Sequence, residues 1–138
     1  MIYYIKHFFS YVIISVLSVM IFGAFLVSHP EYPGGEVGMV PLLIILNCII
    51  ATCIAFILLL LVRIKTKITL PASTTMFAIL YCLVLIFYFD SNPLEKGDAM
   101  ARNVNTWGYL CLLLSYVLFN LGLAVRRAMV RKDSSQEE

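Results

Sequence analysis

The sequence predicts an all-α membrane protein in which four transmembrane helices form an antiparallel up-down bundle with both termini in the cytoplasm. Four long stretches contain no Asp, Glu, Lys or Arg, and the segments between them differ sharply in charge. Each stretch holds about 20 residues, enough for a helix that rises roughly 1.5 Å per residue to cross the hydrocarbon core. The expected spans are 8–27, 39–62, 68–89 and 107–125, followed by a polar cytoplasmic tail at 126–138.

Composition favours a single membrane domain that takes up the whole chain, residues 1–138. Of these residues, 62% are hydrophobic and only 13% are charged, against about a quarter in soluble domains. The net charge of +2 comes without a groove-sized basic patch, which argues against a nucleic-acid partner. Four spans and short connections leave no room for a separate soluble domain.

The first span begins like a signal peptide, because Lys6 and His7 precede the apolar run. A signal core is only about 7–15 residues long, and a small-residue cleavage site follows it. This run is longer, and the segment 25–30 reads Phe-Leu-Val-Ser-His-Pro. We therefore expect a first span that the protein retains.

The remaining spans are separated by loops whose charges set the orientation. The first loop has no Lys or Arg, the second is short and basic, and the third is mostly acidic. Placing both termini and the basic loop inside puts eight of the ten Lys and Arg residues in the cytoplasm, as the positive-inside rule requires. We place the chain in a bacterial cytoplasmic membrane. The short loop also makes the second and third spans antiparallel neighbours.

Small and weakly polar side chains recur along one face of three spans. In the second span, Asn47, Ala51 and Ala55 occur at every fourth position. Helices in lipid associate through such faces, because lipid tails are as apolar as leucine. These faces would serve equally to build the bundle or to dock another membrane protein. The corresponding residues are Thr74, Ala78 and Cys82 in the third span and Cys111, Ser115 and Gly122 in the fourth.

Amides and hydroxyls inside the spans are candidate intramembrane contacts, because a polar group in hydrocarbon needs a partner. An interhelical hydrogen bond is worth about 0.6–2 kcal/mol. Asn47 and Asn120 stand out, either as structural hydrogen bonds or as a site for a ligand, a lipid headgroup or a partner helix. We expect them in opposite halves of the membrane. The full set is Asn47, Thr52, Thr74, Ser115 and Asn120.

The spans hold no charged residue, which argues against proton-coupled transport and against a proton relay. No phosphate loop, serine elbow or zinc helix motif occurs, and His29 with Glu31 and Glu36 matches no strong metal pattern. We therefore expect no catalytic residue, no cofactor, no metal and no enzymatic activity. The cysteines are expected to pack as small apolar residues. They are Cys48, Cys53, Cys82 and Cys111.

Two charged surfaces flank the predicted bundle. The outer loops are acidic, and they form either solvated connections or a recognition face for a basic partner. The inner tail is basic and favours anionic lipid by about 1 kcal/mol for each nearby charge. The outer residues are Glu31, Glu36, Asp90, Glu95 and Asp98, and the inner residues are Arg126, Arg127, Arg131 and Lys132.

These observations favour a small non-enzymatic protein that acts through helix–helix interaction in the bilayer, as an accessory or assembly subunit or as an immunity-type protein. In span count and orientation the chain is similar to four-span immunity proteins that protect bacteria from pore-forming toxins, a likeness of architecture without a shared motif. The alternative is a small oligomeric transporter, channel or flippase without an intramembrane charge. The implied partners are the lipid bilayer and either another membrane protein or further copies of the chain.

Overall fold

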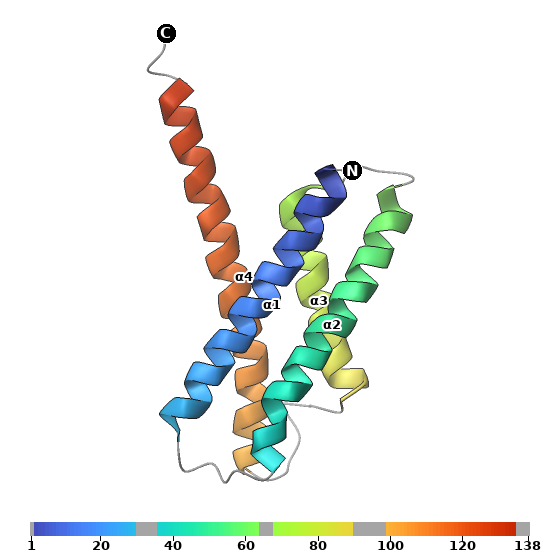
Figure 1. Cartoon of the computed structure of the whole chain (residues 1–138), viewed down its shortest axis with the longest axis vertical. Helices are drawn as coiled ribbons and strands as arrows, with labels where there is room; N and C mark the ends of the chain where they lie inside the picture. Colours follow the sequence, from blue (N-terminus) through green and yellow to red (C-terminus); the bar gives the residue numbers. More distant parts are fainter. Residues whose placement is uncertain (1, 30–35, 64–67, 90–98, 135–138) are drawn as a thin grey trace.

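Four helices make up the part of the chain that the computed structural model describes. That part comprises residues 2–29, 36–63, 68–89 and 99–134, apart from the side chains of residues 36–38, 63, 100–101 and 130–134. The helices are α1 (Ile2–Ser28), α2 (Glu36–Arg63), α3 (Leu70–Phe87) and α4 (Ala99–Ser134) (Figure 1). Within the described residues, each contains an apolar stretch long enough to cross a membrane. The prediction of an all-helical protein with four candidate membrane spans is confirmed, and an integral membrane location follows.

Helices α1, α2 and α4 extend beyond the spans expected from hydropathy, most clearly α4, whereas α3 is two residues shorter at each end than the predicted span 68–89. This helix includes the end of the predicted third loop, residues 99–106, and continues into the predicted tail as far as Ser134. Its 36 residues, at about 1.5 Å each, exceed a hydrocarbon core of about 30 Å. Its C-terminal part rises past the ends of the other helices (Figure 1). Hydropathy marks only the stretch that lipid surrounds, whereas the backbone hydrogen bonds of a helix continue past it.

The shortest helix, α3, has clear local signals at both ends. Thr69 is extended, and the Ser73 amide donates to the Thr69 carbonyl oxygen over 3.0 Å. Pro71 lies in the first turn, where a missing N–H removes no intrahelical bond. At the other end, the Tyr88 amide donates to the Val84 carbonyl oxygen over 2.9 Å. These signals fix α3 at 18 residues, about 27 Å by the helical rise.

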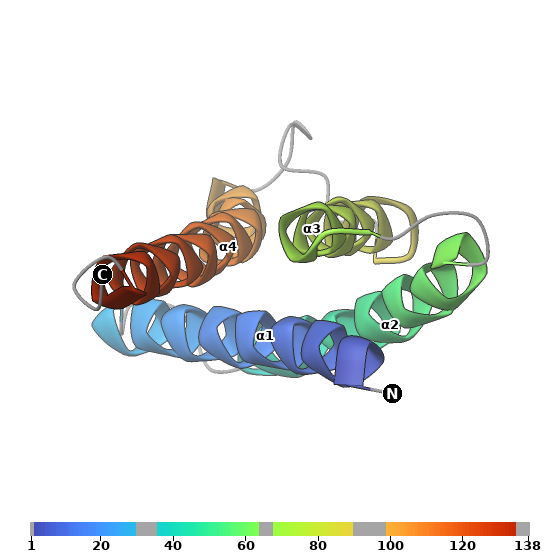
Figure 2. The same ribbon diagram turned by 90° about the horizontal axis from the view of Figure 1, so that it is seen from above.

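Helices α1 and α3 lie at the centre of the contacts in the bundle, because each of them contacts all three other helices. Figure 2 shows α1 along one side and α3 along the other, with α4 and α2 at the two flanks. Large side chains fill the space between them and are fully buried. These side chains are Tyr11 and Phe22 from α1, Phe77 and Tyr81 from α3 and Leu112 from α4.

The small-residue face of α2 points into this core. Asn47, Ala51 and Ala55 are fully buried and Cys48 is buried beside them. The large apolar side chains of the same helix, such as Ile49 and Leu61, are exposed on its other side. This arrangement is typical of a helix in lipid, where small faces meet protein and leucine-like faces meet acyl chains.

Candidate functional site

Asn47 of α2 and Tyr81 of α3 form a polar pair inside the bundle. Both residues are fully buried, and Asn47 Nδ2 donates to the backbone oxygen of Tyr81 over 3.3 Å. Among the described residues, Asn47 Oδ1 and the Tyr81 hydroxyl make no hydrogen bond of ordinary geometry, although the two side chains interact with each other. A buried polar atom without a partner costs about 1–3 kcal/mol. The pair therefore places one acceptor and one hydroxyl in the interior without a third partner among the described residues.

Two further hydrogen bonds tie α1 to its neighbours. The Tyr11 hydroxyl is hydrogen bonded to Ser73 Oγ of α3, and the Tyr11 ring stacks on Phe77 with the ring centroids 5.2 Å apart. Ser18 Oγ donates to the Cys111 backbone oxygen of α4 over 3.5 Å. These contacts join α1 to α3 and α4 through the centre of the molecule, so they have a structural role.

Sequence reasoning did not single out Tyr11 or Tyr81, although both belong to this polar interior. Both lie well inside their helices rather than at the ends, where a membrane protein usually places tyrosine. A tyrosine in the middle of a span needs a partner for its hydroxyl. Their position in the middle of a span could have identified these two tyrosines as part of the polar interior.

The other predicted polar residues are not brought together. Thr74 donates to the Pro71 carbonyl oxygen over 2.9 Å and Ser115 to the Cys111 carbonyl oxygen over 2.7 Å, each within its own helix. Asn120 likewise donates to its own helix. In the described part of the chain, Asn47 is therefore the one member of the predicted set whose side chain bonds to another helix.

The predicted outer recognition face cannot be placed. Glu31, Asp90, Glu95 and Asp98 lie outside the described residues, and Glu36 begins α2 with a side chain that is not described. Among the described residues, no group of three or more His, Cys, Asp or Glu side chains is positioned to hold a metal ion.

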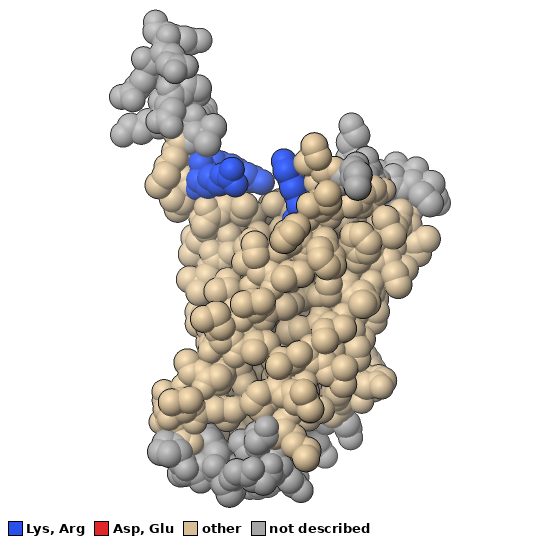
Figure 3. All heavy atoms as spheres, viewed as in Figure 1, with Lys and Arg blue, Asp and Glu red and all other residues tan. Residues whose placement is uncertain are grey.

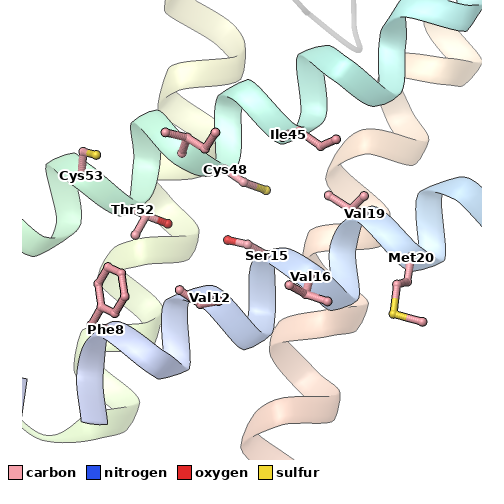
Figure 4. Close-up of a pocket in the computed structure, with 11 residues that line it drawn as sticks. Phe8, Val12, Ser15, Val16, Val19, Met20, Ile45, Cys48, Thr52 and Cys53 are labelled. Atoms are coloured by element: carbon pink, nitrogen blue, oxygen red, sulfur yellow. The ribbon is translucent and has the colours of Figure 1, made fainter. Parts of the chain in front are cut away.

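A cleft between α1 and α2 contains the fifth predicted residue, Thr52. The cleft has a volume of about 480 Å³, and every residue that lines it belongs to α1 or α2 (Figure 4). Ser15 and Cys48 point toward one another across it, and the Ser15 hydroxyl interacts with the Cys48 thiol, although Ser15 Oγ makes no hydrogen bond of ordinary geometry with a described residue. The other lining residues are Phe8, Val12, Val16, Val19, Met20, Ile45, Ile49 and Cys53.

Aromatic side chains close one end of this α1–α2 cleft. The Phe8 and Phe56 rings meet edge to face with centroids 5.7 Å apart, and Tyr4 meets Phe56 in the same way at 6.4 Å. Val12, Ser15 and the two cysteines leave the middle open because their side chains are short. The result is an apolar cleft in the middle of the span that contains hydroxyl groups and no charge.

The positions of the four cysteines do not support a catalytic role for their thiols. Cys48 and Cys111 are buried, Cys82 is half-buried and Cys53 is exposed on α2. All four are free thiols, and no described residue beside them is an acid that could form part of a catalytic group.

No protein-family model, curated protein or solved structure matches the chain.

Proposed function

We propose that the chain is a non-enzymatic membrane protein that binds one transmembrane helix of another membrane protein in the α1–α2 cleft. It would act as an accessory or assembly subunit, or as an immunity-type protein. The observation that supports this proposal is the cleft itself, an apolar opening between α1 and α2 with the Ser15 hydroxyl inside it. Short side chains allow a second helix to approach closely, and a hydroxyl adds an interhelical hydrogen bond.

The interior of the bundle supports a lateral partner rather than a pore through one copy. Tyr11, Phe22, Phe77, Tyr81 and Leu112 are fully buried and occupy the space that an axial path would need. The small faces of α2 and of the first part of α4 already pack within the chain. The α1–α2 cleft, where Ser15, Thr52 and Cys53 lie among larger apolar side chains, is the surface that we assign to the partner.

The orientation belongs to the same proposal. We place the chain in a bacterial cytoplasmic membrane as an antiparallel bundle with both termini in the cytoplasm, on the charge distribution of its loops. A reporter fused after Glu138 should then show cytoplasmic activity. Activity on the outer side would contradict the orientation. The acidic outer residues would be free to meet a basic segment of the partner.

Photocrosslinking tests the partner proposal directly. A photoreactive amino acid at Val16, in the cleft, should capture another membrane protein in native membranes, and mass spectrometry would identify it. Val117 on α4 is the matched control, because the two valines are 51% and 47% exposed and both lie in the middle of their helices. Equal labelling from both positions, or capture of lipid alone at Val16, would contradict the proposal. Capture of a second copy of this chain would indicate that the cleft joins identical chains in a homo-oligomer instead of binding a different protein.

A second candidate function is a small oligomeric transporter, channel or flippase. The buried Asn47 Oδ1 and Tyr81 hydroxyl favour it, because a polar solute would need such groups. In liposomes the protein should then pass a solute, ion or lipid, and Asn47→Leu should abolish this flux while Asn120→Leu, whose amide bonds its own helix, leaves more of it. Flux that is unchanged in Asn47→Leu would exclude a pathway through this pair.

A further inference from the structure

Three cations from opposite ends of the sequence line one hollow between α1 and α4. Lys6 lies near the start of α1, and Arg126 and Arg127 lie near the end of the apolar stretch of α4. Figure 3 shows the Lys and Arg side chains facing each other across a notch at one end of the molecule. The hollow has a volume of about 830 Å³, within the range of roughly 300–1,000 Å³ that small-molecule sites occupy. We call it the α1–α4 hollow.

The hollow exists because the C-terminal half of α4 diverges from the rest of the bundle. In Figure 1 this half rises away from α3, which begins at Leu70 beside the hollow. The residues of this half of α4 that line the hollow are Phe119, Leu123, Arg126 and Arg127. A Cβ atom added at the adjacent Gly122 would meet nothing within 4 Å, so no neighbouring helix packs closely on α4 at this level.

Apolar side chains line the hollow below the cations. Phe9 and Ile13 of α1 face the same space as Phe119 and Leu123 of α4. On each helix the nearer apolar residue, Phe9 or Leu123, lies three residues from a basic residue, and the farther one, Ile13 or Phe119, lies seven residues away, toward the middle of the span. The hollow is therefore cationic where it reaches the end of the bundle and apolar where it lies inside the span.

The cations have no partner in the described structure. None of the three side chains forms a hydrogen bond or an ion pair with a described residue, and every Asp and Glu of the chain has a side chain outside the described set. Guanidinium groups bind phosphate through paired N–H donors. Lysine adds a flexible point charge at the same level.

We propose that the α1–α4 hollow binds one anionic phospholipid. Its phosphate would sit between Lys6 and the two arginines, and an acyl chain would lie along Phe9 and Leu123. Basic pockets between transmembrane helices commonly hold anionic headgroups in this way. The combination of charge and apolar lining selects a lipid over free inorganic phosphate, since a free anion would leave the apolar part unused. This site is separate from the α1–α2 cleft and does not depend on a partner there.

Native mass spectrometry of the full chain in detergent tests the site. Titration with phosphatidylglycerol should load one lipid per chain at concentrations where phosphatidylcholine does not load. Lys6→Gln should weaken this binding about fivefold, and the double variant Arg126→Gln with Arg127→Gln about 25-fold, at about a factor of five for each charge. Arg102→Gln is the control, because Arg102 is also exposed but lies at the other end of α4. It should leave the binding unchanged.

Several outcomes would overturn the proposal. Equal loading of the two lipids would show adventitious association, and an equal loss in Lys6→Gln and Arg102→Gln would show attraction by net charge alone. Displacement of the lipid by inorganic phosphate, with phosphate retained, would assign the cations to a free anion. Ile13→Trp narrows the apolar part without changing charge and should also weaken lipid binding, whereas Val117→Trp should not. Unchanged binding in Ile13→Trp would exclude an acyl chain there. Circular dichroism and gel filtration of each variant confirm folding.

Discussion

The two halves of α4 carry similar residues but have different surroundings. In the first half, Cys111 and Ser115 are buried against the rest of the bundle. In the second half, Gly122 is exposed with open space around it, and Asn120 is half-buried with its amide bonded to its own helix. This difference indicates that a face of small residues packs against another helix only where the tilt of its own helix keeps the two helices close.

The largest expected effect comes from enlarging one small residue in each half. Ser115→Leu should lower the free energy of unfolding by about 1–3 kcal/mol, because added volume in a filled core forces its neighbours to move. Gly122→Leu should leave it unchanged or raise it by up to about 1 kcal/mol, since leucine favours the helix over glycine. Unfolding in mixed micelles with increasing denaturing detergent would measure both. Equal losses would mean that the second half of α4 is also packed in the membrane.

The two asparagines give a smaller contrast. Asn47→Leu removes a hydrogen bond between α2 and α3, worth about 0.6–2 kcal/mol, and also removes the Oδ1 atom that lacks a bond of ordinary geometry, so the net loss should be about 1 kcal/mol or less. Asn120→Leu should cost still less, because its amide bonds the Tyr116 carbonyl oxygen of its own helix. The same unfolding assay applies. A larger loss in Asn120→Leu than in Asn47→Leu would contradict this difference between the two asparagines.

The smallest expected effect lies at the point where the two halves of α4 meet. Thr75 of α3 and Tyr116 of α4 share a hydrogen bond of 2.7 Å between their hydroxyls. A double-mutant cycle with Thr75→Val and Tyr116→Phe should give a coupling free energy of about 0.6 kcal/mol, the average for such bonds in a membrane. A coupling near zero would mean that α3 and α4 already separate at this level, which would lengthen the α1–α4 hollow.

The α1–α2 cleft and the α1–α4 hollow differ in a way that assigns them different ligands. The first is uncharged, lies in the middle of the span and holds the Ser15 hydroxyl. The second ends in Lys6, Arg126 and Arg127 at one end of the molecule. A transmembrane helix suits the first, and a molecule with an anionic head and an apolar tail suits the second. Lys6→Gln should therefore leave crosslinking at Val16 unchanged, so the two proposals can fail separately.

Predictions from the sequence were most complete where a single property of the residues, such as hydropathy or spacing, determines the structure. The four apolar stretches predicted four helices of spanning length, because lipid admits only segments that satisfy their own backbone hydrogen bonds. The face of Asn47, Ala51 and Ala55 could be proposed as a packing face from spacing alone. The extent of α4 could not be predicted, since a helix continues past the membrane wherever no stop signal occurs.

Sequence by itself determined the apolar segments, the absence of charge within them and the sorting of basic residues between the connections, because each depends on residue type and order alone. Tertiary structure decided which small residues are buried, and it alone brought Lys6 to the same hollow as Arg126 and Arg127. The reason is that helix tilt follows from the packing of side chains from several helices. Side chains that are distant in the sequence become neighbours only once α1 and α4 have fixed their crossing.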